Sequence, residues 1–327
     1  MSNPEEHPQE FVGGAPHHQA PIKVLGAREV PLGGVRAMTV RRTIPHRELR
    51  MIGAWCFLDH YGPDDVASTG GMAVARHPHT GLSTVSWLFT GEIDHLDSAG
   101  NRARVRPGEL NLMTAGRGIS HSEFSTTDTT VLHGAQLWLA APNHTRDAEP
   151  RFDHYRPEPT PIAGGTARVF LGDWLGARSP IEYPVPVVGA EIVLDPGARW
   201  NAPLSPDFEY GFLLDTGTVR ISHRALDEHD LAYVSPGGAE LPIEAGASGA
   251  RLLVIGGEPF AEKIVMWWNF IGRSHDEIVA YRARWQAEMT ADIDSARDTE
   301  LFGPFPPDTP APIAAPPLPN SRLVSRN

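Results

Sequence analysis

The sequence lacks the features that define several common protein classes. It contains a single cysteine, so no disulfide can form within the chain, and we expect a reducing compartment. No run of about eighteen apolar residues occurs, which excludes a transmembrane helix. The first residues, MSNPEEHPQEFVGG, carry neither the basic nor the apolar region of a secretory signal. We therefore predict a cytoplasmic protein that makes no use of a membrane.

Basic residues are scarce relative to acidic ones. The chain has 28 Lys and Arg against 40 Asp and Glu, a net charge of −12. An acidic chain repels nucleic-acid phosphates unless its basic side chains gather in one patch. The densest basic stretch, residues 36–50, alternates arginines with Val40, Ile44 and Leu49, which is typical of a solvated strand face. We therefore expect no direct binding of nucleic acid.

Helical periodicity is almost absent. Short β-rich runs, such as 84–89, 136–139 and 252–255, alternate with turns in a chain that has 32 glycines and 31 prolines. This cadence is typical of all-β sandwiches and barrels. One segment, 274–296, repeats apolar residues at helical spacing and begins with the serine and glutamate of a capping box. The sequence thus predicts an all-β fold with one short C-terminal helix.

A weak internal repeat indicates two copies of one β-module. In each half, a strand ends at a glycine turn (residues 87–92 and 212–217), and a Pro-Gly turn follows (106–110 and 234–238). Between the halves lies a proline-rich stretch. For the proline-rich C-terminal tail, we predict a solvated chain in preference to a partner-binding segment. The expected organisation is a flexible segment 1–20, a first, metal-binding domain 21–145, a linker 146–165, a second domain without a metal site 166–273, a helix 274–296 and a tail 297–327.

Two short pairs of residues give the strongest indication of function. Side chains at positions i and i+2 of a strand share a face, so His77 and His79 should lie side by side, as should His121 and Glu123. Two neighbouring strands inside a barrel would aim all four groups at one point. Three imidazoles and one carboxylate suit a divalent first-row transition metal. One such pair is more often a surface feature, but two pairs together favour a metal site.

Longer motifs around these pairs resemble the pirin family. FLDHYGP at 57–63, HPHTGLSTV at 77–85 and PGELNLMTAGRGISHSE at 107–123 are similar to pirin segments, and NFIGRSHDEI at 269–278 resembles a later one. Pirins are bicupins, so the resemblance implies two cupin β-barrels packed face to face. It also implies one metal ion per chain in the N-terminal barrel, held by residues matching His77, His79, His121 and Glu123. Iron is expected first, with nickel, manganese, copper and zinc as alternatives.

The resemblance leaves two functional classes open. In the first, which we favour slightly, the metal site opens the ring of a flavonol such as quercetin, and Glu123 both ligates the metal and accepts the substrate proton. In the second, the oxidation state of the metal changes the surface offered to a regulatory protein partner. Cupins and many pirins carry a glutamate shortly after the histidine pair, where this chain has Ser83 and Thr84. This departure changes the polarity near the site without removing an expected ligand.

The remaining candidate residues receive ordinary structural interpretations. A glycine-rich turn at 114–118 lacks the lysine of a phosphate-binding loop. His60 and His95 could orient metal ligands, but satisfied or exposed histidines are the commoner case. We expect packing or surface roles for Cys56 in the core, Arg117 at the surface, and Trp267 and Trp268 in the core of the second barrel.

Overall fold

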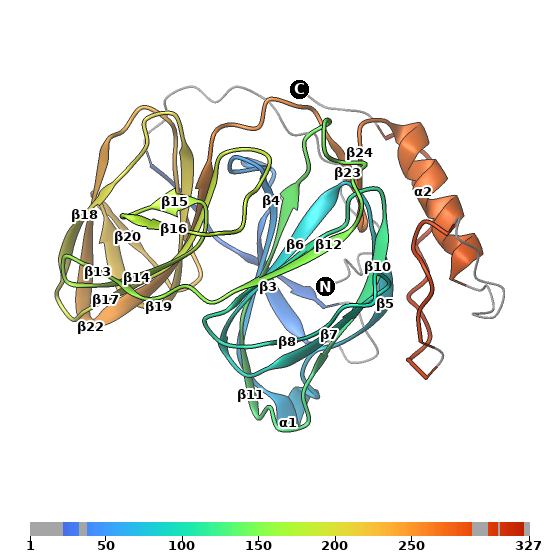
Figure 1. Ribbon diagram of the computed structural model, residues 1–327. Coiled ribbons are helices and arrows are strands. Elements are labelled where there is room, and N and C mark those ends of the chain that lie inside the picture. Colours follow the sequence, from blue (N-terminus) through green and yellow to red (C-terminus); the bar gives the residue numbers. More distant parts are fainter. Residues whose placement is uncertain (1–21, 33–37, 290–299, 307, 324–327) are drawn as a thin grey trace.

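The computed structural model describes residues 22–32, 38–289, 300–306 and 308–323. Strands dominate these residues and form two barrel-like domains that lie side by side, with one well-formed helix at the edge of the first (Figure 1). The all-β fold with a short C-terminal helix is therefore confirmed. No helix in the described part of the chain is long and apolar enough to cross a membrane.

The first domain combines a large sheet with a small one. The large sheet runs, in spatial order, β12 (Arg151–Tyr155), β9 (Leu110–Thr114), β6 (Leu82–Thr90), β11 (Val131–Ala140), β4 (Trp55–Asp65), β3 (Thr39–Ile44) and β2 (Arg28–Pro31). The small sheet runs β5 (Ala73–His79), β10 (Ile119–Ser125), β7 (Ile93–Asp97) and β8 (Arg102–Val105). A one-turn helix, α1 (Val66–Thr69), follows β4. The small sheet carries the predicted metal ligands.

The second domain is built on one nine-stranded sheet. Its main path runs β1 (Lys23–Leu25), β21 (Leu231–Val234), β19 (Glu209–Ile221), β22 (Glu240–Gly257), β17 (Val187–Leu194), β14 (Gly165–Leu171) and β13 (Thr160–Ile162); β18 (Arg199–Pro203) pairs with β22 and β20 (Arg224–Leu226) with β19. Two hairpins stand apart: β15 (Asp173–Trp174) with β16 (Ala177–Arg178), and β23 (Val265–Trp267) with β24 (Phe270–Gly272). Apolar side chains of the large sheet, including Trp200, Phe212 and Val254, form the core of this domain.

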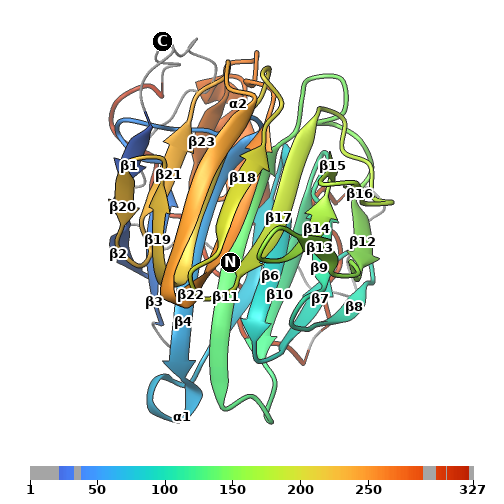
Figure 2. The same cartoon turned by 90° about the vertical axis from the view of Figure 1, so that its left-hand side faces the viewer.

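A shared apolar core joins the two large sheets. Figure 2 shows β17, β19 and β22 in front of β4, β6 and β11. Trp55, Trp87 and Leu137 from the first sheet are buried in one cluster with Phe170 and Ile255 from the second. The rings of Trp87 and Phe170 stack with centroids 4.5 Å apart. Short apolar runs, 55–58 in β4 and 137–140 in β11, are fully buried because the large sheet is covered on both faces.

Three short strands depart from the predicted domain boundaries. β1 lies in the range assigned to the first domain, yet it pairs with β21 of the second sheet. The predicted linker contains β12, which extends the first sheet beside β9, and β13, which pairs with β14. Edge strands of this kind depend on their tertiary neighbours more than on their own composition. The predicted flexible segment 1–20 lies outside the described residues.

Helix α2 (His275–Glu288) begins where the capping pattern predicts. Ser274 Oγ accepts a hydrogen bond from the Glu277 N–H at 3.2 Å. In a capping box, the glutamate carboxylate accepts a hydrogen bond from the N–H of the capping serine. Here Glu277 Oε2 accepts instead from the N–H of the preceding residue, Arg273, at 3.0 Å. Both bonds satisfy amide donors at the start of the helix. The predicted continuation beyond residue 289 lies outside the described residues.

The described part of the C-terminal tail is not the solvated chain that its composition predicts. Phe302 and Phe305 are buried. Trp285 Nε1 of α2 donates to Ile313 O at 2.8 Å, and the Ile313 N–H donates to Arg76 O of β5 at 2.8 Å. Prolines prevent regular structure here. Apolar side chains of the tail nevertheless pack in the clusters that contain α2 and Val74 of β5, and Figure 1 shows the backbone of the tail running beside α2. The tail therefore covers the outer side of a ligand-bearing strand.

Trp267 and Trp268 also lie elsewhere than predicted. They belong to the cluster formed with α2 and the tail and not to the core of the second barrel. The β23–β24 hairpin leaves the second sheet and reaches the first barrel, where Phe270 forms a bridge with Thr80. This hairpin also brings the Asn269 carbonyl next to the predicted metal site.

The basic stretch at 36–50 is only partly a solvated face. Arg47 is exposed, as predicted, but Arg42 is buried. The Arg42 guanidinium donates to both carboxylate oxygens of Asp59, at 2.7 and 2.8 Å, and lies 4.3 Å from the Phe57 ring centre. Its charge is therefore neutralised inside the domain. Arg36 lies outside the described residues.

Candidate metal centre

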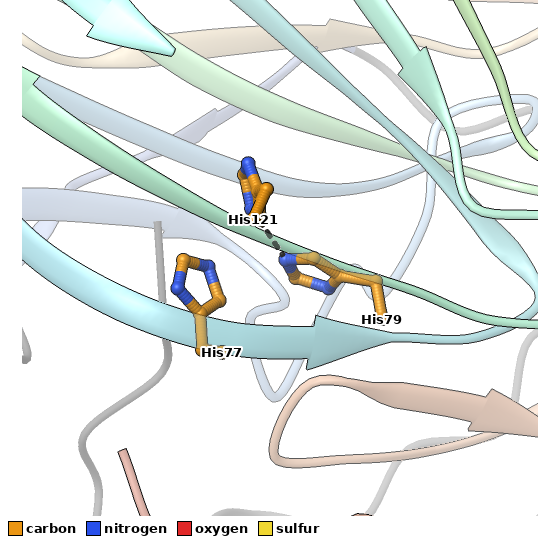
Figure 3. A group of neighbouring side chains, drawn as sticks. All are labelled: His77, His79 and His121. Atoms are coloured by element: carbon orange, nitrogen blue, oxygen red, sulfur yellow. Dashed lines mark hydrogen bonds between the residues drawn. The ribbon is translucent and has the colours of Figure 1, made fainter. Parts of the chain in front are cut away.

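Strands β5 and β10 bring the two predicted ligand pairs together. They are antiparallel neighbours whose register pairs His121 with His77 and Ile119 with His79. Figure 3 shows the rings of His77, His79 and His121 turned toward one another. Their centroids are 4.3 Å apart for His77 and His121, 5.0 Å for His79 and His121, and 5.1 Å for His77 and His79. The three imidazoles thus form one compact group.

Glycine turns set this register. Gly81 lies in the turn after β5 at φ +64°, and a Cβ there would lie 2.4 Å from the Ile271 carbonyl oxygen. Gly116 precedes β10 at φ +53°, and the Gly81 N–H donates to its carbonyl at 2.9 Å. Both positions need a backbone conformation that L side chains avoid. These two glycines therefore join the ligand strands at their shared end.

Main-chain acceptors leave two histidine Nε2 atoms free to bind a metal. His77 Nδ1 lies 2.8 Å from Ala75 O, and His79 Nδ1 lies 3.2 Å from Asn269 O. A carbonyl oxygen only accepts hydrogen bonds, so each Nδ1 carries the proton and each Nε2 carries the lone pair. His77 Nε2 is buried without a hydrogen-bond partner among the described residues. A metal ion is the kind of ligand that satisfies such an atom.

The third imidazole completes this donor set. His121 Nε2 lies 3.1 Å from His79 Nε2, a separation that needs a proton or a cation between the two atoms. His77, His79 and His121 are each 0% exposed, and burial lowers the pKa of all three well below the usual range. They are therefore neutral, which is the form of imidazole that binds metals. The residues present fit the metal that the sequence predicts.

Glu123 joins this group from one side. The carboxylate is 1% exposed, and a strand bulge after His121 sets Glu123 opposite Val74. Ligand atoms of Glu123, His121 and His95 lie within 4.8 Å of one another, as do those of the three histidines above. Ser86 Oγ approaches Glu123 Oε1 at 3.3 Å. The structure therefore groups the three predicted histidines together and links Glu123 to them through His121.

His95 is a further buried histidine beside this group. The sequence favoured a satisfied or exposed histidine at this position over one that orients a metal ligand. His95 is 5% exposed, and its Nδ1 lies 3.4 Å from His121 Nδ1. The available signal was another pair at i and i+2, His95 and Asp97, on a strand next to β10. That signal needed the strand order, which the sequence alone did not provide.

A second histidine cluster lies between the two domains. His60 Nε2 on β4 and His133 Nε2 on β11 each lie 2.6 Å from Asp215 Oδ1 on β19. Arg251 Nε donates to Asp215 Oδ2 at 2.5 Å. The geometry of His60, His133 and Asp215 could also hold a metal ion, and all three are buried. Sequence reasoning missed this cluster because its members are up to 155 positions apart.

Two other expectations for individual residues are confirmed. Arg117 lies at the surface and pairs with Glu149 at 2.9 Å, so it does not face the site. Cys56 is buried in the core, and burial raises the pKa of its thiol, which keeps it protonated and unreactive.

Comparison with known proteins identifies the family. The family model described as Pirin matches residues 35–139, and the model described as Pirin C-terminal cupin domain matches 189–291. The Pseudomonas aeruginosa protein named "Putative quercetin 2,3-dioxygenase PA1205" is 39% identical over 305 residues, which cover 92% of each chain. Human pirin is 29% identical over 73% of this chain and 83% of its own length.

Solved structures agree with this assignment. A structure titled as quercetin 2,3-dioxygenase from Acinetobacter baumannii superposes with a TM-score of 0.84 at 36% identity, covering 92% of this chain and 96% of that one. Escherichia coli YhhW, solved in complex with nickel(II), has a TM-score of 0.57 at 19% identity, covering 73% of this chain and all of that one, and shares the fold. The chain belongs to the pirin family and consists of an N-terminal pirin domain and a C-terminal cupin domain.

Proposed function

We propose that the chain binds one divalent transition-metal ion through His77, His79, His121 and Glu123, and opens the ring of a flavonol such as quercetin with dioxygen. The observation that carries the metal site is the group of buried imidazoles whose Nε2 atoms face one another, with His77 Nε2 lacking any partner among the described residues. The donor set accepts iron, nickel, manganese, copper or zinc, and resemblance to pirins favours iron. The names of the two relatives at 39% and 36% identity support the reaction.

Each residue has a role that follows from its contacts. When bound, the metal would supply a Lewis acid at which substrate oxygens and dioxygen could meet. His77 and His79 are held in position by the Ala75 and Asn269 carbonyls. Glu123, the anionic member of the set, would reduce the charge of a divalent site from +2 to +1. Its carboxylate would also accept the proton of the flavonol hydroxyl, while the buried surroundings exclude bulk water.

Metal analysis and turnover on the same preparation test this proposal. Protein loaded separately with Fe²⁺, Ni²⁺ or Mn²⁺ is expected to hold one equivalent and to consume quercetin. The matched variant is Glu123→Gln, which keeps the size and one ligand oxygen but loses the charge and nearly all basicity. It should retain part of its metal and lose turnover by about 100-fold, the scale of a missing general base. Fully loaded wild-type protein that leaves flavonols unchanged would refute the enzymatic proposal.

Burial of the site favours a second candidate, a regulatory protein without turnover. The four proposed ligands are at most 1% exposed. In this candidate, the oxidation state of the metal changes the surface offered to a protein partner. Hydrogen exchange should then differ between the Fe²⁺ and Fe³⁺ forms at β5 and the tail above it. Identical exchange in both forms would reject this candidate.

A further inference from the structure

His95 and Asp97 lie directly behind His121. Strand β7 pairs with β10 so that His95 is opposite Glu123 and Asp97 is opposite His121. Directly paired residues project from the same face of a sheet, so both β7 side chains enter the interior that holds the proposed ligands. His95 Nδ1 lies 3.4 Å from His121 Nδ1, and His95 Nε2 lies 3.3 Å from Asp97 Oδ2. These contacts form a chain from Asp97 through His95 to His121.

Asp97 is a fixed acceptor at the outer end of this chain. Its Oδ1 accepts from the main-chain N–H groups of Ala99 and Asn101, each at 3.0 Å. Asn101 Nδ2 approaches both carboxylate oxygens, at 3.1 and 2.9 Å. The loop between β7 and β8 thus holds the carboxylate in place. A carboxylate so surrounded by donors accepts the His95 Nε2–H.

The protons along the chain then have one consistent arrangement. Because His95 Nε2 donates to Asp97, its Nδ1 carries a lone pair and acts as an acceptor. The Nδ1–H of His121 points at this acceptor, so His121 Nε2 presents its lone pair to the site. For His77 and His79, main-chain carbonyls perform the same task. His121 is therefore the imidazole of the three whose orientation depends on another side chain.

We infer that His95, held by Asp97, is a positioning residue that fixes the tautomer of His121 and thereby sets the metal affinity of the centre. The inference rests on the proposed metal site. A carboxylate behind an imidazole also increases the basicity of the ligand nitrogen, and here His95 transmits that effect. His95 could alternatively be a ligand of a second ion shared with His121 and Glu123. Two dications so close would repel strongly, and His121 would have to lose its second ring proton, so the hydrogen-bonded chain is favoured.

Two substitutions at one position separate hydrogen bonding from packing. His95→Asn keeps a carbonyl oxygen close to the place of Nδ1, whereas His95→Leu offers no acceptor. In competition with a chelator for Ni²⁺, His95→Leu should weaken affinity by about 10–100-fold, the usual cost of removing such a partner. His95→Asn should recover most of that loss. Equal affinity in wild type and His95→Leu would overturn the inference.

The control is Ile93→Val on the same strand. Ile93 is fully buried, so the smaller side chain loosens β7 without changing an acceptor. It should lower the melting temperature of the apoprotein and leave the Ni²⁺ affinity unchanged. In ¹⁵N spectra of the Zn²⁺-loaded protein, the His121 Nδ1–H signal should shift in His95→Leu and not in Ile93→Val. If His95 had a purely structural role, His95→Leu and Ile93→Val would behave alike in both measurements. A difference between the two variants would exclude that role.

Stoichiometry keeps this inference distinct from the proposed function. If wild-type protein binds no metal, both are refuted. If it binds one equivalent and His95→Leu binds as tightly, only the positioning role is refuted. If wild type binds two equivalents and His95→Leu binds one, His95 is a ligand and the positioning role is again refuted.

Discussion

The two buried histidine clusters contain the same kinds of groups and differ in what stands behind the rings. In the metal centre, the Nδ1 atoms of the first two histidines face main-chain carbonyl oxygens. In the interdomain cluster, the Nδ1 atoms of His60 and His133 face arginines. Arg41 Nε lies 3.4 Å from His60 Nδ1, and Arg251 Nη2 lies 3.4 Å from His133 Nδ1. An acceptor stands behind the first pair of rings and a donor behind the second.

This difference decides where the protons lie. An imidazole with an acceptor at Nδ1 presents a lone pair at Nε2, and one with a donor at Nδ1 presents an N–H at Nε2. His60 and His133 therefore donate to Asp215 Oδ1, while Arg251 donates to the other oxygen. The interdomain cluster is thus a closed hydrogen-bond network that joins the barrels, although its geometry could hold an ion. That the second barrel binds no metal stays a prediction.

The largest expected effect comes from removing two imidazoles of the metal centre. His77→Ala combined with His121→Ala should abolish stoichiometric metal binding, measured by elemental analysis after dialysis. Adding a chelator to wild-type protein should also lower its melting temperature, because an ion held at 1,000 times its dissociation constant stabilises the fold by about 4 kcal/mol. The matched control is His60→Ala with His133→Ala, which should keep one equivalent. Full occupancy in the first double variant would refute the ligand assignment.

Asp215→Ala should cause the next largest effect, a loss of stability that spares the metal centre. It leaves His60, His133 and Arg251 without their shared acceptor inside the interface. Breaking a buried pair in this way costs about 3–5 kcal/mol, and partial exposure of Arg251 places the expected value near the lower end. Urea unfolding measures the loss, with the exposed Asp207→Ala as control. Metal content should stay at one equivalent, and a loss of metal in Asp215→Ala would contradict the separation of the clusters.

The candidate metal centre could be predicted from the sequence because its geometry is mostly local. The period of a strand places His77 beside His79 and His121 beside Glu123, and only two strands then have to meet. The interdomain cluster has no local signal. It depends on the register of three strands and on the packing of one sheet against another, which no spacing motif records.

In the fold, too, the elements that depend on distant neighbours could not be predicted from the sequence. The cadence of short strands and the internal repeat were enough to predict two β domains, and helical spacing with a capping pattern predicted the helix at residue 274. These patterns were not enough to place β1, whose three residues pair with β21 of the second sheet. Nor did they place Trp267 or the tail around Phe302, which pack in one buried cluster with Trp285 of α2. Short or proline-rich segments gain their structure from neighbours that are distant in sequence.

Low pH should reduce the stability of the fold through the titration of His60 and Asp215 in the interdomain cluster. Burial lowers the pKa of His60, so the unfolded chain binds more protons, and stability should fall as pH drops below about 6.5. Burial raises the pKa of Asp215, but hydrogen bonds from His133 and His60 outweigh this and lower it. Its contribution is therefore lost as pH falls below about 3.9.

A glutamine at position 60 isolates the first of these effects. His60→Gln keeps an N–H donor for Asp215 but does not titrate. Urea unfolding in the presence of a chelator, which removes any contribution from metal release, should show a flatter dependence on pH between 6.5 and 5 for this variant. If the free energy of unfolding depends equally on pH in wild type and variant, His60 does not contribute to the acid sensitivity.

The smallest expected effect tests whether one arginine is enough to keep the interdomain cluster free of metal. Arg41→Met retains the aliphatic stem but removes the donor behind His60, at a cost of about 1 kcal/mol for a long hydrogen bond. Arg41 also lowers the pKa of His60 through its charge, so an NMR titration should show a higher His60 pKa in the variant. Zn²⁺ titration should still give one equivalent per chain, because Arg251 continues to hold both His133 and Asp215. A second equivalent in the variant alone would mean that the Arg41 donor by itself separates the two clusters. A second equivalent in wild type would mean that the partners of Nδ1 do not decide where a metal binds.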